Sequence, residues 1–198
     1  MKTQAVYKTP GKYHDNGSYG DYFIMDAKKK IGIKVLHRTY NRKNMLCEFQ
    51  NILDQLVEYG EHEDFHHDSS IWNIIQEYVV LQMLEPLKEV PRAIGLTFVE
   101  RCGKYSIGIM MEHISGHTLW KMDEDGKLTN CFGDRFNMKA RKLGFNIDDW
   151  HQGNIIHDGK TFYRIDFSPG HFSTIRKSEF NQRVTHEFIA LMERAPFN

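Results

Sequence analysis

Two aspartates and an asparagine stand at spacings that could serve one reaction. Asp149 precedes Asn154 by five residues in DWHQGN, and Asp166 follows twelve residues later in IDFS. Carboxylate and amide oxygens are ligands that Mg²⁺ accepts, and a carboxylate can also orient a hydroxyl group that attacks a phosphate. The set therefore indicates phosphoryl transfer, if a lysine elsewhere in the chain neutralises the phosphate oxygens.

The residues between Asn154 and Asp166 predict a short β-hairpin, with strands at 155–156 and 162–165 and an Asp-Gly turn at 158–159. Asp and Asn often cap ordinary turns, so Asp149 and Asn154 alone would be weak evidence of a site. An Asp between Ile and Phe in a core strand is different, because its charge requires a partner. We therefore expect the hairpin to bring Asp166 to the segment that carries Asp149.

Hydrophobic periodicity predicts an α+β chain, β-rich at first and then helical around the short hairpin. We expect a strand hairpin at 21–36, a helix at 44–59, a helix from Ser70 to near Pro86, strands at 94–99 and 105–112, a helix at 129–143 and a terminal helix at 178–194.

In this order the motifs resemble those of the protein-kinase-like superfamily, over most of the chain. The kinase catalytic loop places an Asp five residues before an Asn, and a DFG-type Asp follows; Asp149, Asn154 and Asp166 stand at these positions. The D-x-H-x-x-N form, with His151, is similar to aminoglycoside phosphotransferases and to some short phage-encoded protein kinases. The resemblance implies that Asp149 is catalytic and that Asn154 and Asp166 bind metal.

Residues upstream resemble the nucleotide-binding motifs of the same superfamily. Lys34 in IGIKVL is similar to the phosphate-contacting lysine of the VAIK strand. Met111 matches the gatekeeper, and Glu112 to Ile114 match the hinge that contacts adenine. GSYG resembles the latter half of the glycine-rich loop, which adds Gly17, Ser18, Tyr19 and Gly20 to the nucleotide-binding residues. The cofactors that this resemblance implies are ATP and Mg²⁺.

Kinases hold this lysine with a glutamate on a neighbouring helix, the C-helix. Glu77 is the favoured catalytic partner of Lys34, because its predicted helix directly precedes the next strand pair. Glu48, on the earlier predicted helix, is a rival at shorter range in the sequence. If Glu77 is the partner, residues 37–69 form a helical insertion relative to a standard kinase.

Departures from the kinase pattern favour a minimal enzyme. Ile147 and Asp148 replace the His and Arg that usually precede the catalytic Asp, and Ser168 replaces the Gly of DFG. Too few residues follow Asp166 for a full activation segment and a large helical lobe. We expect a two-lobed minimal protein-kinase-like fold, similar in build to short phage-encoded or bacterial effector kinases. Residues 1–114 would form a β-rich N-lobe with its C-helix, and residues 115–198 a reduced helical C-lobe.

Three functions fit this pattern. The first is a serine/threonine protein kinase that transfers the γ-phosphate of ATP to a hydroxyl group of a protein substrate, including a protein of a host cell. The second is a small-molecule phosphotransferase of the aminoglycoside type, which His151 favours and the short C-terminal region disfavours. The third is a pseudokinase that serves as a binding module, which the full set of polar site residues disfavours. No motif identifies the physiological substrate.

The composition argues against several other classes. Lys and Arg together number 26, as do Asp and Glu, so the balanced charge gives no general attraction for nucleic acid or anionic membranes. The three cysteines form no CxxC pair, and no apolar run suits a signal peptide or a membrane span. We expect a cytoplasmic protein, of its own cell or of a host. The acidic and histidine-rich stretch at 61–68 fits a solvated loop better than a zinc site.

The departures generate a prediction about regulation. Asp148 replaces the Arg that would pair with a phosphate on the activation loop, and an acid there would repel one. We expect phosphatase treatment to leave the transfer rate unchanged, whereas a host lysate or a purified partner bound to residues 37–69 should raise it. Loss of activity on dephosphorylation, with no stimulation by any lysate fraction, would contradict this account.

Overall fold

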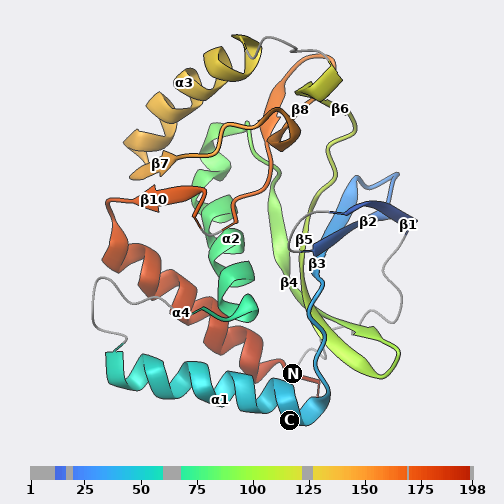
Figure 1. The fold of residues 1–198 in the computed structure, drawn as a ribbon, viewed down its shortest axis with the longest axis vertical. Coiled ribbons are helices and arrows are strands. Elements are labelled where there is room, and N and C mark those ends of the chain that lie inside the picture. Colours follow the sequence, from blue (N-terminus) through green and yellow to red (C-terminus); the bar gives the residue numbers. More distant parts are fainter. Residues whose placement is uncertain (1–11, 17–19, 60–67, 122–126, 169, 197–198) are drawn as a thin grey trace.

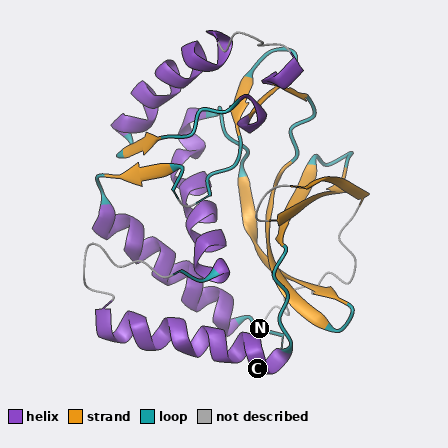
Figure 2. Ribbon diagram, viewed as in Figure 1, coloured by secondary structure: helices purple, strands orange, loops and turns teal. Residues whose placement is uncertain are grey.

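The computed structural model describes the chain apart from residues 1–11, 17–19, 60–67, 122–126, 169 and 197–198. The fold is mixed α and β, as the sequence predicts. Its main sheet is antiparallel and has the strand order β1-β2-β3-β5-β4. The helices gather on one side of this sheet, and Figure 2 shows the division between the two kinds of element. The strands of the sheet are β1 (Lys12–Asn16), β2 (Gly20–Asp26), β3 (Ile31–Leu36), β4 (Ala93–Arg101) and β5 (Lys104–Glu112).

The central helix is α2 (Ser70–Leu84), which lies between the sheet and α4 (Lys177–Glu193) (Figure 1). Ser69 caps its start, because the Ser69 side chain accepts a hydrogen bond of 3.0 Å from the amide of Trp72. Pro86, in the 3₁₀ turn that follows, ends it. Most residues of α2 are buried, so neighbours surround this helix on nearly every face.

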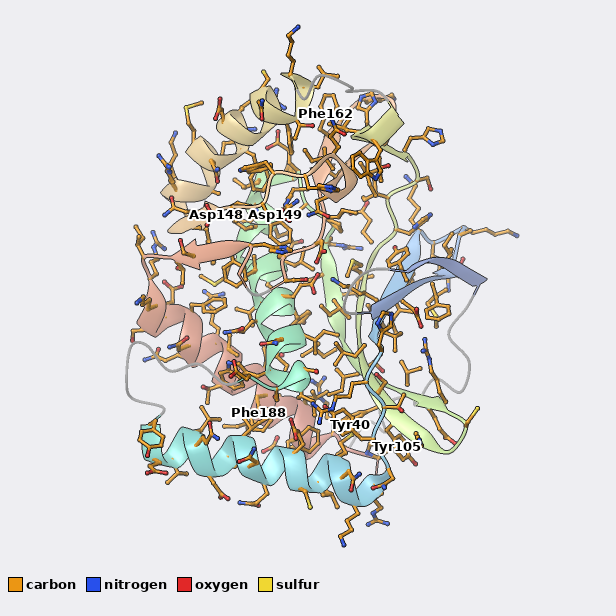
Figure 3. The ribbon with its side chains drawn as sticks, in the orientation of Figure 1. Tyr40, Tyr105, Asp148, Asp149, Phe162 and Phe188 are labelled. Atoms are coloured by element: carbon orange, nitrogen blue, oxygen red, sulfur yellow. The ribbon has the colours of Figure 1, made fainter. Side chains whose placement is uncertain are left out.

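Three aromatic side chains join α2 to the two helices beside it. Phe188 of α4 lies edge-on to Trp72 of α2, with ring centroids 6.0 Å apart. It also lies edge-on to Phe49 of α1 (Arg42–Tyr59), at 5.8 Å. Figure 3 shows Phe188 between α1 and the central helix. Buried side chains of α1, α2, α4 and one face of the sheet belong to one continuous cluster, and Phe23, Ile33, Val35 and Val99 of the sheet form a second, smaller one.

The segment before α1 remains attached to the sheet. Tyr40 and Tyr105 exchange two backbone hydrogen bonds of 2.7 Å (Figure 3). The Ser106 hydroxyl donates to the backbone oxygens of Leu36 and Arg38 at 2.9 and 3.0 Å. The expected helical segment at 37–69 is therefore this attachment followed by α1; residues 60–67 lie outside the described part.

The second half of the chain contains α3 (Lys127–Lys142) and two small sheets. One has the order β6-β8-β9 and includes the predicted hairpin; the other pairs β7 with β10 and was not predicted. The β7–β10 pair aligns Ile147 with Phe172, so the segment after Asp166 returns beside the segment before Asp149. Their bounds are β6 (His117–Thr118), β7 (Phe145–Ile147), β8 (Ile155–His157), β9 (Phe162–Arg164) and β10 (Phe172–Thr174).

The structure also bears on the expectations about cysteines, membrane spans and the stretch at 61–68. The cysteines Cys47, Cys102 and Cys131 are free and exposed. Within the described residues, every helix is too short or too polar to cross a membrane. The stretch at 61–68 lies outside the described part, except for Asp68. Across that described part, no group of three or more His, Cys, Asp or Glu side chains is suited to hold a metal ion.

The packing of α4 on α2 generates a prediction about stability. Phe188 is completely buried against Trp72 and Phe49, so Phe188→Ala should lower the free energy of unfolding by about 3–5 kcal/mol. Ile189, the next residue on α4, is 39% exposed, and Ile189→Ala should cost less than about 1 kcal/mol. Urea denaturation of both variants measures the difference. Equal costs for the two substitutions would contradict the packing described.

Candidate active site

A cleft of about 570 Å³ separates the main sheet from the second half of the chain. Its walls contain every predicted site residue that the structure describes: Gly20, Lys34, Glu77, Met111, Glu112, Ile114, Asp149, Asn154 and Asp166. The predicted residues Gly17, Ser18 and Tyr19 lie outside the described part. Residues far apart in the sequence therefore share one cavity.

Lys34 occupies the centre of this arrangement. Its ammonium group on β3 donates to both carboxylate oxygens of Glu77, at 2.8 and 2.9 Å, and to Oδ1 of Asp166 at 2.9 Å. Glu77 is held by α2, and its Oε1 also lies 3.4 Å from the amide nitrogen of Phe167. Glu77, the favoured partner of Lys34, is thus the glutamate that contacts it. The rival Glu48 lies on α1, where its charge acts on Tyr40.

The electrostatics of this group agree with its geometry. Burial alone would raise the pKa of Asp166, but the Lys34 charge, hydrogen bonds from Ser168 and Lys34, and the Arg164 charge lower it to about 2. Burial alone would lower the pKa of Lys34, but Glu77 and Asp166 together raise it above its ordinary value. At neutral pH Lys34 is therefore a cation in contact with the ionised Asp166.

The two aspartates share an unusual backbone conformation. Asp149 has φ of 51° and Asp166 has φ of 62°, in the left-handed region that non-glycine residues seldom adopt. The Ser168 hydroxyl donates to Oδ1 of Asp166 at 2.6 Å, within the turn after the aspartate. Such conformations persist where the surrounding contacts over-determine them, which is common in functional sites.

Asp149 lies on the other wall of the cleft. The side-chain nitrogen of Asn154 donates to its Oδ2 at 2.8 Å, and Nδ1 of His171 lies 3.4 Å from the same oxygen. A 3₁₀ turn at Gln152–Asn154 produces this approach, and His151 begins the turn by accepting from the Gly153 amide at 3.1 Å. The five-residue spacing from Asp to Asn is thus the length of one tight loop.

The structure distinguishes Asp149 from its neighbour Asp148. Figure 3 labels the two side by side on the loop after β7. Both aspartates are exposed, but only Asp149 is part of the cleft wall, whereas the Asp148 amide donates to the backbone oxygen of His171 at 2.8 Å. The register that assigns the functional position to Asp149 agrees with this placement.

The far end of the cleft is lined by the end of β5 and by β2. Met111 is buried there, beside Glu112 and Ile114. Gly20 allows its strand to approach β3 closely, because a Cβ atom at this position would lie 2.5 Å from the backbone oxygen of Val35. The Tyr22 hydroxyl lies 3.2 Å from Nδ1 of His113, and both rings line the cleft.

Several of these residues were not predicted from the sequence. Tyr22 stands two residues after Gly20, so its position could have been inferred from the glycine-rich loop, whereas His113 already belongs to the expected hinge from Glu112 to Ile114. His171 has no such signal, because only the unpredicted β7–β10 pairing returns it to Asp149. Arg164, whose charge acts on Asp166, stands on the predicted hairpin but was not singled out.

The oxygen atoms present could complete a Mg²⁺ site only together with a ligand. Asp166 offers a carboxylate, and Asn154 an amide oxygen, because its nitrogen is engaged with Asp149. Mg²⁺ commonly takes one or two such protein ligands along with waters and phosphate oxygens of a nucleotide. The residues present fit that pattern.

Comparison with known proteins adds no family assignment. No protein-family model matches the chain, and no curated protein matches it.

The lowered pKa of Asp166 generates a prediction about acid stability. Its folded-state pKa of about 2 lies below the unfolded value of about 3.9, so the ionised carboxylate stabilises the fold at neutral pH. This stabilisation is fully present above about pH 5 and is lost as the pH falls toward 2. The unfolding free energy of the wild type, relative to Asp166→Asn, should fall by about 2 kcal/mol over this range.

Urea denaturation at each pH, with EDTA present, measures the effect. Asp148→Asn, which removes an exposed carboxylate outside the cleft, is the matched control and should run parallel to the wild type. A constant difference between the wild type and Asp166→Asn would show that Asp166 is not held ionised by Lys34.

Proposed function

We propose that this chain is an ATP- and Mg²⁺-dependent phosphotransferase with the two-lobed build of a minimal protein kinase. The observation that carries the proposal is the Lys34 ammonium, bonded to Glu77 and Asp166 in a cleft whose opposite wall holds Asp149. A cation between carboxylates, facing a further carboxylate across a cavity, suits a phosphate chain and an attacking hydroxyl group. Residues 1–114 would form the N-lobe and residues 115–198 the C-lobe.

Each residue has a role in this proposal. Lys34 binds phosphate oxygens, and Glu77 orients the Lys34 side chain from α2. Gly20 would face the phosphates, whereas Met111, Glu112 and Ile114 would contact the adenine. Asp166 and Asn154 hold Mg²⁺, which when bound neutralises charge on the phosphates.

Asp149 acts on the acceptor. Its Oδ2 accepts from Asn154, and the carboxylate orients the acceptor hydroxyl and receives its proton as the phosphate–oxygen bond forms. The γ-phosphorus loses its bond to the bridging oxygen, and ADP leaves with the electron pair. The sum is transfer of one phosphoryl group from ATP to a hydroxyl, with release of a proton.

A serine or threonine of a protein is the favoured acceptor. After Asp166 the described chain forms only the short β10 and α4, and α4 packs on α2 rather than beside the cleft. Neither β10 nor α4 lines the cleft, so neither encloses a small molecule there. His151, which lines the cleft two residues from Asp149, is the observation that keeps a small-molecule acceptor as the second candidate. Labelled ATP with generic protein substrates, beside a small-molecule panel, separates the two.

The proposal also includes an activating partner protein, but the structure limits how such a partner could act. The Lys34–Glu77 contact forms within this chain alone, and α2 is surrounded by α1, α4 and the sheet. A partner would therefore act by presenting a substrate more than by moving α2.

Removal of the proposed metal carboxylate should abolish the reaction. Asp166→Ala is expected to lose both transfer and the Mg²⁺-dependent part of nucleotide binding, because it removes the proposed metal carboxylate, which also contacts Lys34. Lys34→Ala should instead mainly impair placement of the phosphates. Activity assays and nucleotide titrations with and without Mg²⁺ measure both effects. Unchanged Mg²⁺-ATP turnover in Asp166→Ala would remove the kinase proposal.

Substitution of Asp149 should affect chemistry more than binding. Asp149→Asn keeps the size of the side chain but removes the proton acceptor, so transfer should fall by about 10²–10⁴-fold. Nucleotide affinity should stay close to that of the wild type. The control is Asp148→Asn, which changes the exposed neighbour outside the cleft. A loss in the control with none in Asp149→Asn would show that the roles of the two aspartates are reversed.

A further inference from the structure

Arg164 is a buried charge that the proposed reaction does not use. It is the last residue of β9 and has no exposed surface. Its three side-chain nitrogens have no hydrogen-bond acceptor among the residues that the structure describes. Desolvation of a charged group is costly unless something compensates it, so the surroundings of Arg164 have to account for this placement.

Two aromatic faces enclose the guanidinium group. Its central carbon lies 5.4 Å from the centre of the Trp150 ring and 5.6 Å from that of Phe167. Cations are attracted to aromatic faces at such distances, and the attraction increases away from water. Trp150 directly follows Asp149, and Phe167 directly follows Asp166. Arg164 therefore lies between the neighbours of the two aspartates of the proposed reaction.

Both rings are themselves held in place. The Trp150 indole donates to the backbone oxygen of Ile147 at 3.0 Å, and its ring packs so closely on α3 that a Cβ atom at Gly133 would lie 2.8 Å from it. Phe167 is completely buried, and its amide lies 3.4 Å from Glu77. A displacement of Arg164 would thus be transmitted to both segments.

Three carboxylates surround this cation at longer range. Burial lowers the pKa of Arg164 to about 10, and the charges of Asp166, Asp149 and Glu77 oppose that change. The side chain therefore remains a cation at neutral pH. An apolar side chain of similar length would fill the same space without desolvation of a charge, so packing alone does not account for an arginine here.

We propose that Arg164 is a positioning residue that fixes the Asp149 segment relative to the Asp166 segment, through the faces of Trp150 and Phe167 and through its buried charge. The catalytic role of Arg164 rests on the proposed function. Its effect on the placement of the two segments can be measured without any assay of activity. Asp148, not an arginine, directly precedes Asp149. Arg164, at the end of β9, instead contacts the loop after Asp149 through the ring of Trp150.

Two variants separate the charge from the shape. Arg164→Met keeps the length of the side chain and removes the charge, whereas Arg164→Lys keeps the charge and removes the planar group. Arg135→Met is the matched control, because Arg135 also lies over an aromatic ring, that of Phe132 at 5.7 Å, but its side chain is 51% exposed and outside the cleft.

Kinetics should show a larger loss of kcat than of nucleotide binding. We expect Arg164→Met to lose about a hundredfold in kcat, the scale of effect of a misplaced reacting group. KM for ATP should change less than kcat does, because Arg164 does not line the cleft and acts on it only through the neighbouring segments. Arg164→Lys should recover about tenfold of the loss, and Arg135→Met should behave as the wild type.

Hydrogen exchange supplies a measurement that needs no activity. Amides of residues 148–154 and 166–168 should exchange faster in Arg164→Met than in Arg135→Met, with α1 and α4 unchanged. Normal kcat in a folded Arg164→Met, or faster exchange spread evenly over the whole chain, would overturn the proposal. If Arg164→Met does not fold, wild-type kcat and wild-type exchange in Arg164→Lys would overturn the role of the planar group.

The outcome for Arg164 can be told apart from the outcome for the function. If the wild type transfers phosphate to no acceptor, the proposed function fails. The local exchange in residues 148–154 still decides whether Arg164 positions that loop.

Discussion

The arrangement depends on one partly buried ammonium group, that of Lys34. Lys34 contacts Glu77 of α2 and Asp166 after β9, and it stands on a central strand of the main sheet. Removal of one member of such a group from the interior leaves an uncompensated charge, which is strongly destabilising. The positions of β3, α2 and the segment after β9 are therefore mutually constrained, and the walls of the cleft follow from that constraint.

Much of the fold could be predicted because its longer elements carry clear periodic patterns. The apolar stripe of α2, with Pro86 beyond it, and the hairpin around the Asp-Gly turn at 158–159 are local signals, and the structure confirms both. β7 and β10 are three residues long and pair with each other across a long stretch of chain. No alternation can develop in so few residues, so nothing local distinguishes them from loop.

The residues of the candidate site also divide into those that the sequence could predict and those that it could not. That Lys34, Asp149, Asn154 and Asp166 share one cleft could be predicted because the proposed reaction restricts their types and spacing, and the choice of Glu77 over Glu48 followed from the order of elements. Arg164 differs, since its importance comes from burial beside Trp150 and Phe167. Burial of a single residue on a short strand depends on what packs over it, which the sequence does not state.

The packing of α4 on α2 has a consequence for how the molecule is synthesised. Trp72 and Phe49 leave the ribosome long before Phe188, which completes their surroundings. Contacts between such distant parts of a chain form late and slow folding. The nascent chain therefore carries exposed aromatic surface, which favours aggregation, until α4 has emerged. A chain interrupted before α4 would present this surface permanently and be a substrate for chaperones and proteases.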